Sequence, residues 1–120
     1  MRLISFSMTE PQILDRSKTV TRRTGWRHAK AGDLLRGVHK CMGFKPGEKP
    51  RTLATVRVVE VRRERLDAIT DQDVAREGYP GQSADWFVAK FCQAMRCTPE
   101  TEVARIEFEY VDEGEGGGAR

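Results

Sequence analysis

The sequence contains no long hydrophobic segment. Its apolar runs are all far shorter than the roughly 20 residues that a membrane-spanning helix requires. The N-terminal residues 1–6 become polar too early for a secretory signal peptide. We therefore expect a cytoplasmic protein without a membrane partner.

Cysteine is also scarce. Cys41, Cys92 and Cys97 are odd in number and irregularly spaced, which argues against a disulfide framework and fits a reducing compartment. These three residues and His39 could form a zinc site, but their spacing is not that of a zinc ribbon or knuckle. We therefore predict no metal and no cofactor.

Internal repeats are absent as well, and a chain of 120 residues is typical of one domain that buries a real core. Residues 112–120 are rich in Gly and Glu and are predicted to be disordered. The predicted domain therefore spans residues 1–111.

Positive charge is concentrated in the first half of the chain. Residues 1–63 hold fifteen Lys and Arg and five Asp and Glu. Residues 64–120 hold six Lys and Arg and thirteen Asp and Glu. One interpretation is an anionic partner, with nucleic acid or a nucleotide as the leading candidates. The other is that both halves fold together and their charges mix on one surface. The sequence alone leaves both open.

Short strands dominate the first half. Apolar and β-branched residues predict strands at residues 2–6, 34–38 and 51–63. The alternation slips at Val58-Val59, which predicts a bulge in the third of these strands. A short helix is predicted to begin after the N-cap Thr9 and to end near Ser17.

Two helices are predicted in the second half. The first begins after the N-cap Thr70 and ends at Gly78, so that Glu77 lies in its last turn. Val74 and Ala75 are predicted to face inward.

The second of these helices follows the N-cap Ser83. Phe87, Phe91 and Met95 recur every four residues along it. We interpret this stripe as core rather than as a ligand site, because aromatic stripes are usually buried.

The closing strand is predicted at residues 102–111. Its predicted buried face carries Ala104, Ile106, Phe108 and Tyr110, and its predicted exposed face carries Arg105, Glu107 and Glu109. Together the elements describe an α+β chain whose sheet curls into a small, partly open β-barrel, with short helices packed at its ends.

The stretch richest in reactive groups begins at Lys18 and ends at Arg23. In an extended segment, Lys18 and Arg22 point to one side, and Thr19, Thr21 and Arg23 point to the other. An amine beside a hydroxyl can activate a nucleophile if the amine is partly neutral. Guanidinium groups can hold a phosphate or a polarised carbonyl. A plain basic strand is the simpler alternative.

This stretch and its surroundings resemble the ASCH domain family, a branch of the PUA-like β-barrel folds. The family signature is Gly-x-Lys-x-x-(Glu or Thr)-x-Arg after a short first helix, and Lys18, Thr21 and Arg23 match it in spacing. Arg16 stands where the signature has glycine. The turn at Gly32-Asp33 into the next strand and the acidic helix after the long strand also match, so the resemblance covers nearly all of the predicted domain.

The resemblance implies an activity. Family members with Thr at the third position after Lys include small amidohydrolases that remove the acetyl group from N(4)-acetylcytidine. The catalytic set carried over is Lys18, Thr21 and Glu77. Thr21 would attack the acetyl carbonyl, Lys18 would take the hydroxyl proton, and Glu77 would carry a proton to the cytosine amine.

Four further residues are predicted to bind the substrate. Arg23 would stabilise the oxyanion, with Arg22 and Thr19 beside it. Trp26, among basic residues, could stack on a base or cover one end of the barrel as a core aromatic.

A second class of function is RNA binding without catalysis, or a ribonuclease activity, because PUA-like domains commonly bind RNA. Arg27 and the basic loop between residues 39 and 52 would then follow the phosphate backbone. The predicted partner is therefore a modified nucleoside or RNA.

Overall fold

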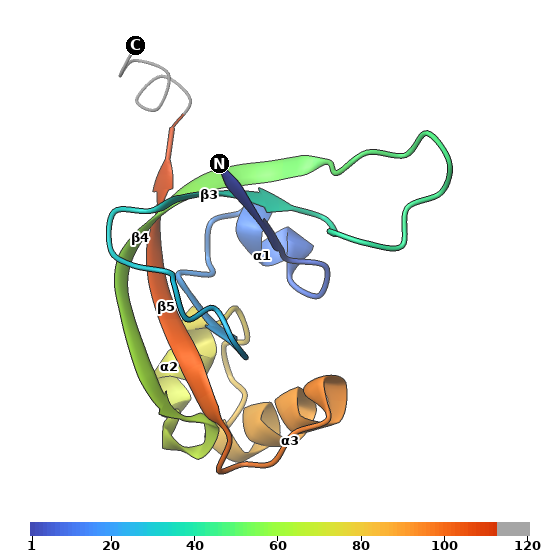
Figure 1. The fold of residues 1–120 in the computed structure, drawn as a ribbon. Helices are drawn as coiled ribbons and strands as arrows, with labels where there is room; N and C mark the ends of the chain where they lie inside the picture. Colours follow the sequence, from blue (N-terminus) through green and yellow to red (C-terminus); the bar gives the residue numbers. More distant parts are fainter. Residues whose placement is uncertain (113–120) are drawn as a thin grey trace.

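A single curled sheet organises the part of the chain that can be described (Figure 1). The computed structural model describes residues 1–112, so the predicted disordered tail of residues 112–120 lies, except for Asp112, outside the described residues. In chain order the elements are β1 (Arg2–Ser5), α1 (Glu10–Leu14), β2 (Val20–Arg23), β3 (Leu34–Val38), β4 (Thr52–Arg65), a short 3₁₀ helix (Leu66–Ala68), α2 (Asp71–Arg76), α3 (Ala84–Met95) and β5 (Glu102–Val111).

Strands β1 and β2 form the two edges of the sheet, whose order is β1-β3-β4-β5-β2. β1 pairs in parallel with β3, and the other three pairings are antiparallel. Figure 1 shows α1 at one end of the curl, where it contacts β4, with α2 and α3 toward the other end. This is the predicted α+β architecture, a partly open β-barrel with short helices at its ends.

The two longest strands, β4 and β5, form the curve of the sheet. Their pairing passes from Val58 opposite Phe108 to Glu60 opposite Glu107, so Val59 is left out and its side chain is exposed. The predicted bulge is thereby confirmed. A bulge bends its strand and increases the local twist, which helps the sheet to curl.

Apolar side chains gather in two clusters. The first lies inside the curl and contains Ile4, Phe6, Ile13, Leu35, Val56, Val58, Ala104, Ile106 and Phe108. The second lies between β5 and the helices α2 and α3, and contains Leu66, Ile69, Val74, Phe87 and Val103. Because the neighbours Val103 and Ala104 belong to different clusters, β5 is covered on both faces at this point.

The predicted exposed face of β5 is wrong at Arg105, which is only 3% exposed. The predicted buried residues Ala104, Ile106 and Phe108 are indeed buried. Arg105 is covered because α2 packs over this face and supplies Asp73 as its hydrogen-bond partner. Strand alternation reports which residues share a face, but it does not report whether a helix covers that face.

Both helices of the second half begin at their predicted caps. The hydroxyls of Thr70 and Ser83 accept hydrogen bonds from backbone N–H groups in the first turns. Asp73 and Val74 are the buried residues of α2, whereas Ala75 is exposed, so the prediction for Ala75 is wrong. No helix within residues 1–112 is long and apolar enough to cross a membrane.

The aromatic stripe of α3 is core at only one end. Phe87 is buried, Phe91 is half-buried and Met95 is 48% exposed. The prediction that the whole stripe is core is therefore wrong. The helix extends beyond the apolar cluster that covers its first turns, and all three side chains border an open cavity instead.

The turn between α1 and β2 enters the left-handed region at Arg16, whose φ is 64°. Only glycine adopts this region freely. Arg16 therefore adopts a conformation that glycine, the residue at this place in the ASCH signature, would adopt without strain. Its Nη2 lies 2.8 Å from Asp112 Oδ1, and its guanidinium carbon lies 5.4 Å from the centre of the Tyr110 ring.

Two substitutions at Arg16 test this backbone constraint. Arg16→Gly relieves the backbone strain, but it also raises the conformational entropy of the unfolded chain and removes an exposed ion pair. Because these effects oppose each other, the free energy of unfolding should change by less than about 1 kcal/mol. Arg16→Val should lower it by about 1–2 kcal/mol, because a β-branched residue resists positive φ. Urea unfolding measures both, and Asp112→Ala isolates the ion pair. Equal destabilisation by Gly and Val would contradict a backbone role.

Candidate active site

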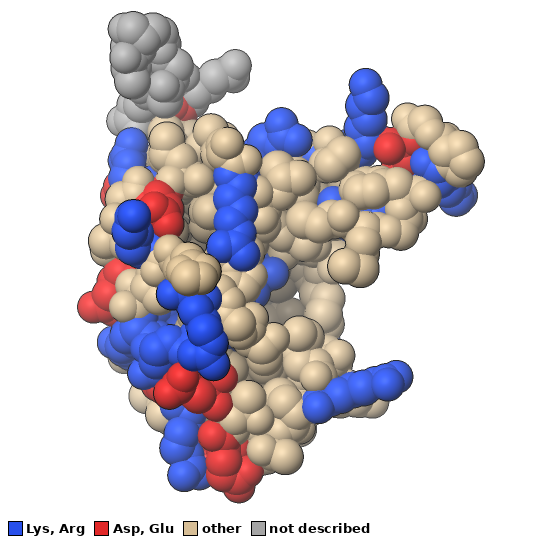
Figure 2. All heavy atoms as spheres, viewed as in Figure 1, with Lys and Arg blue, Asp and Glu red and all other residues tan. Residues whose placement is uncertain are grey.

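A cavity opens where the two edge strands of the sheet approach each other. Its volume is about 300 Å³. Figure 2 shows a hollow between the upper and lower parts of this face. The charged side chains of its lining are Lys18, Arg22, Arg23, Glu77 and Lys90, and Thr21 is one of several lining residues with a hydroxyl group. The large apolar side chains include Phe6, Trp26, Tyr79, Phe87, Phe91 and Met95.

One wall of the cavity holds a buried ion pair. Lys18 Nζ lies 3.0 Å from Glu77 Oε1 and 2.8 Å from the Glu77 backbone carbonyl oxygen. Lys18 is 4% exposed and Glu77 is 2% exposed. Burial lowers the pKa of Lys18 because the charged amine loses its water, and the attraction of Glu77 only partly offsets this. A neutral amine is therefore easier to reach here than at the surface.

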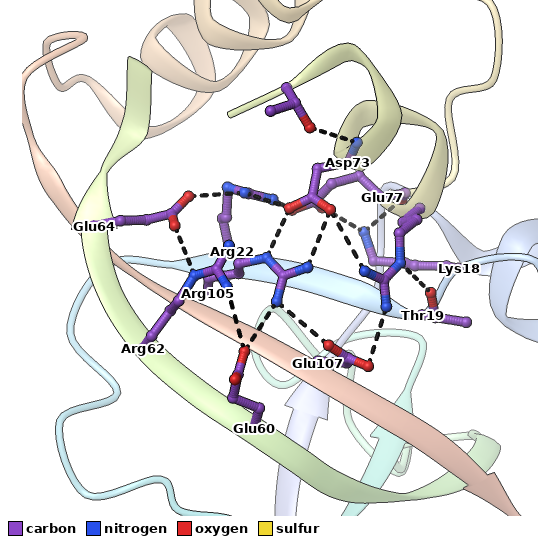
Figure 3. Close-up of polar contacts among 12 residues, drawn as sticks. Lys18, Thr19, Arg22, Glu60, Arg62, Glu64, Asp73, Glu77, Arg105 and Glu107 are labelled. Atoms are coloured by element: carbon purple, nitrogen blue, oxygen red, sulfur yellow. Dashed lines mark hydrogen bonds and ion pairs between the residues drawn. The ribbon is translucent and has the colours of Figure 1, made fainter. Parts of the chain in front are cut away.

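Arg22 extends this pair into a network (Figure 3). Its Nη1 donates to Glu77 Oε2 at 3.1 Å, and its Nη2 donates to Asp73 Oδ2 at 2.7 Å and to Glu64 Oε2 at 2.9 Å. Arg105 holds both oxygens of Asp73, at 2.7 and 3.0 Å. Buried charges are tolerated when they are paired in this way. Within residues 1–112, Nε is the one nitrogen of the Arg22 guanidinium without a partner.

Thr21 and Arg23 form a second pair in the cavity. Arg23 Nε donates to Thr21 Oγ1 at 3.1 Å, and Arg23 Nη2 donates to the Ser5 carbonyl oxygen at 2.7 Å. The second contact joins the edge strand β2 to the edge strand β1 across the opening of the barrel. Burial lowers the pKa of Arg23 to about 10, so the guanidinium still carries its charge at neutral pH.

Contacts from α1 and β5 fix the positions of the segments that carry Lys18 and Glu77. Lys18 N donates to the Gln12 carbonyl oxygen at 3.1 Å, and the Tyr110 hydroxyl donates to the Lys18 carbonyl oxygen at 2.6 Å. The Gln12 side-chain amide donates to the Gly78 carbonyl oxygen at 3.1 Å. Gly78 has a φ of 109°, and a Cβ there would lie 2.9 Å from Gln12 Cγ. Glycine therefore lets α2 end this close to α1.

Trp26 on the cavity wall has a strained backbone. Its φ is 52°, which is rare for a bulky residue. The guanidinium carbon of Arg2 lies 3.7 Å from the centre of its ring, so a cation stacks on the indole. Strained residues that persist in folded proteins are concentrated at ligand sites. A cavity with flat apolar walls and a few convergent polar groups suits a planar, polar ligand.

The structure brings together six of the seven predicted site residues, because Lys18, Thr21, Arg22, Arg23, Trp26 and Glu77 all line this cavity. Thr19 is outside the lining, and its hydroxyl accepts a hydrogen bond from Arg76 Nε at 3.4 Å. The Thr21 hydroxyl is hydrogen-bonded to Arg23, and Lys18 Nζ donates to Glu77 rather than to Thr21.

Three members of the network were not predicted as site residues: Glu64, Asp73 and Arg105. Asp73 precedes Glu77 by four residues in the α2 segment, which puts both on one helix face. That spacing is a signal that could have identified Asp73. No comparable signal marks Glu64 or Arg105, because their contacts depend on which strands pair and in which register.

The alternative zinc set is not assembled. In the described part of the chain, no three His, Cys, Asp or Glu side chains come together as metal ligands. Cys92 and Cys97 adjoin at the end of α3, where Cys97 N donates to the Cys92 carbonyl oxygen at 3.3 Å. His39 and Cys41 belong to the loop between β3 and β4.

The fold is shared with several solved structures. Protein EF3133 from Enterococcus faecalis V583, of the family DUF984, superposes with a TM-score of 0.65 at 16% identity, over 100% of this chain and 83% of that one. The ASCH domain from Lactobacillus crispatus JV V101 superposes with a TM-score of 0.63 at 13% identity, over 91% of this chain and 78% of that one. The hypothetical protein PH0355 superposes with a TM-score of 0.60 at 18% identity, over 92% of this chain and 96% of that one.

No family model matches the chain, and no curated protein matches its sequence. The structural matches show that the chain has the fold of an ASCH domain, a PUA-like, partly open barrel. At these identities the likeness concerns the fold alone.

The Asp73 carboxylate should make the protein sensitive to acid. Hydrogen bonds from Arg105, joined by those from Arg22, hold the pKa of Asp73 well below its usual value of about 4. The unfolded chain therefore takes up this proton before the folded protein does. The free energy of unfolding should fall as the pH drops below about 5. Asp73→Asn should lower it at neutral pH by about 3 kcal/mol, because two buried guanidinium groups lose a carboxylate.

Urea unfolding at several pH values between neutral and about pH 3 measures both effects. The acid-induced loss of stability should be smaller in Asp73→Asn than in the wild type. Asp67→Asn is the control, because it removes an exposed carboxylate that is paired with Arg65. The same acid-induced loss in the wild type and in Asp73→Asn would contradict the assignment.

Proposed function

We propose that this protein is an amidohydrolase that removes the acetyl group from N(4)-acetylcytidine or a related acylated nucleobase. One observation carries the proposal: the Lys18–Glu77 ion pair and the Thr21–Arg23 hydrogen bond line the same aromatic-walled cavity. The match of Lys18, Thr21 and Arg23 to the ASCH signature supports it.

Thr21 would supply the nucleophile. Its oxygen would bond to the acetyl carbonyl carbon, and the bond from that carbon to the cytosine amine would then break. Water would hydrolyse the resulting acetyl ester and release acetate. Arg23, whose Nε already donates to Thr21 Oγ1, would stabilise the oxyanion of the tetrahedral intermediate.

Lys18 and Glu77 would hold the protons that this reaction needs. Moving one proton along the 3.0 Å hydrogen bond from Lys18 Nζ to Glu77 Oε1 leaves a neutral amine and a neutral carboxylic acid. The amine would accept the proton of the Thr21 hydroxyl, and the acid would protonate the leaving amine. The burial that lowers the pKa of Lys18 makes this exchange less costly.

RNA binding without catalysis is the second candidate, and it rests on the loop of residues 39–51. This loop between β3 and β4 projects from the body of the molecule (Figure 1). Lys40 pairs with Glu48 at 3.2 Å, and Arg51 pairs with Glu10 at 2.8 Å. Part of its positive charge is therefore neutralised within the chain, and we rank the hydrolase first.

Incubation with N(4)-acetylcytidine is the direct test and should release cytidine, which chromatography can measure. Thr21→Ala removes the nucleophile and should reduce kcat by about a hundredfold or more. Thr19→Ala is the matched control, because its hydroxyl faces Arg76, and its kcat should stay close to that of the wild type. Full turnover by Thr21→Ala would exclude Thr21 as the nucleophile, and the absence of cytidine from the wild type would refute the hydrolase.

Glu77→Gln separates a proton carrier from a simple counter-ion. Gln keeps the shape of the side chain but cannot deliver a carboxylic acid proton. It also leaves Lys18 and Arg22 short of one negative charge, so both kcat and melting temperature should fall, kcat by about a hundredfold or more.

The control for this variant is Asp73→Asn, which removes one negative charge from the same network but not from the cavity lining. Turnover per folded molecule, measured well below both melting temperatures, should collapse only in Glu77→Gln. If Glu77→Gln were as active per folded molecule as Asp73→Asn, Glu77 would be a counter-ion and not a proton carrier.

A further inference from the structure

The cavity carries more positive charge than a neutral acetylated nucleoside needs. Of the charged residues that line it, four are cationic and one, Glu77, is anionic. Lys18 is balanced by Glu77, and Arg22 is balanced by carboxylates both in the lining and behind it. A cavity lined by one sign of charge concentrates ligands of the opposite sign.

Two cations of the lining remain unbalanced. Within residues 1–112, neither Arg23 nor Lys90 forms an ion pair with a carboxylate. Arg23 donates to Thr21 and to the Ser5 carbonyl, and it already has a role at the reacting carbonyl in the proposed hydrolysis. Lys90 has no such role.

Lys90 lies at the rim of the cavity. Besides lining the cavity, it borders a shallow hollow on the surface of α3 together with Trp86, Ala89 and Gln93. Its Nζ lies 5.7 Å from the centre of the Tyr79 ring and 5.6 Å from that of the Trp86 ring. Both distances are within the reach of a cation–π attraction. Lys90 thus presents its charge beside two aromatic rings at the edge of the cavity.

We propose that the ligand of this cavity is phosphorylated, and that Lys90 binds the 5′-phosphate of an acylated cytidine nucleotide. This inference rests on the proposed function, since the acylated amine must lie at Lys18 and Thr21. The amine and the 5′-carbon are at opposite ends of a nucleoside. A base held against the catalytic residues therefore directs its phosphate outward, to the rim. An ammonium group is a common point-charge partner for a phosphate.

A mononucleotide fits the structure better than an RNA chain. A phosphodiester backbone needs a continuous series of unpaired cations. In the described part of the chain, the basic loop of residues 39–51 leaves only Lys45 and Lys49 without an ion pair, because Lys40 and Arg51 are paired with Glu48 and Glu10. The cavity volume of about 300 Å³ also favours a small ligand.

Binding of cytidine and of cytidine 5′-monophosphate, measured by calorimetry at fixed ionic strength, tests the inference without requiring turnover. The wild type should bind the monophosphate about tenfold more tightly or better, which is the value of one charge-assisted hydrogen bond. Lys90→Gln should bring the ratio of the two affinities, monophosphate to nucleoside, close to one. Lys90→Arg, which keeps the charge, should retain most of it. Lys30→Gln is the matched control, an exposed lysine outside the cavity, and should leave the ratio unchanged.

A second measurement ties the phosphate contact to the reaction. It compares kcat/KM for the acetylated nucleoside with kcat/KM for its 5′-monophosphate. A wild-type ratio near one, a ratio that survives Lys90→Gln, or no binding of either ligand would overturn the inference. So would tighter binding of a short RNA with an internal cytidine than of the mononucleotide. If the phosphate preference depends on Lys90 but no acetyl group is removed, the phosphate contact stands and the hydrolase fails.

Discussion

The burial of Glu77 with Lys18 and Arg22 is the constraint on which the rest of the structure depends. Each of these charges would cost several kcal/mol to remove from water alone. Both oxygens of Glu77 are therefore occupied by cations, and Arg22 continues to Asp73 and Glu64. The partners come from β2, α2, β4 and the turn before β2. Because the network is satisfied only when these elements are docked, it couples the site to the fold.

Three residues with positive φ lie around the same region. Arg16 introduces the segment that carries Lys18, Trp26 follows β2, and Gly78 follows Glu77, and all three have positive φ. For Arg16 and Trp26, which are not glycine, such conformations persist only where surrounding contacts enforce them. Here the contacts come from the Arg2 stack on Trp26 and from Gln12 against Gly78. These turns thus lie beside the two distant segments, residues 18–23 and Glu77, that line one cavity.

The opposite charges of the two halves of the chain are largely resolved inside the molecule. Arg22 from the first half binds Asp73 and Glu77 from the second. Two exposed pairs between strands do the same, Arg57–Glu109 and Arg63–Glu102. Mixing of the two halves therefore accounts for part of the asymmetry, and the cavity lining still carries four cations against one carboxylate.

The sequence by itself determined what depends on local chemistry: the strand at β5, the bulge at Val59, the caps at Thr70 and Ser83, and the alternation that groups Lys18 with Arg22. Tertiary structure alone decided that Arg105 is buried and that Met95 is exposed, because covering a face requires a packing partner that periodicity does not name. It also decided that Lys18 meets Glu77, 59 positions away. That contact follows from strand order and helix docking, which are set by the free energy of the whole fold and not by either segment.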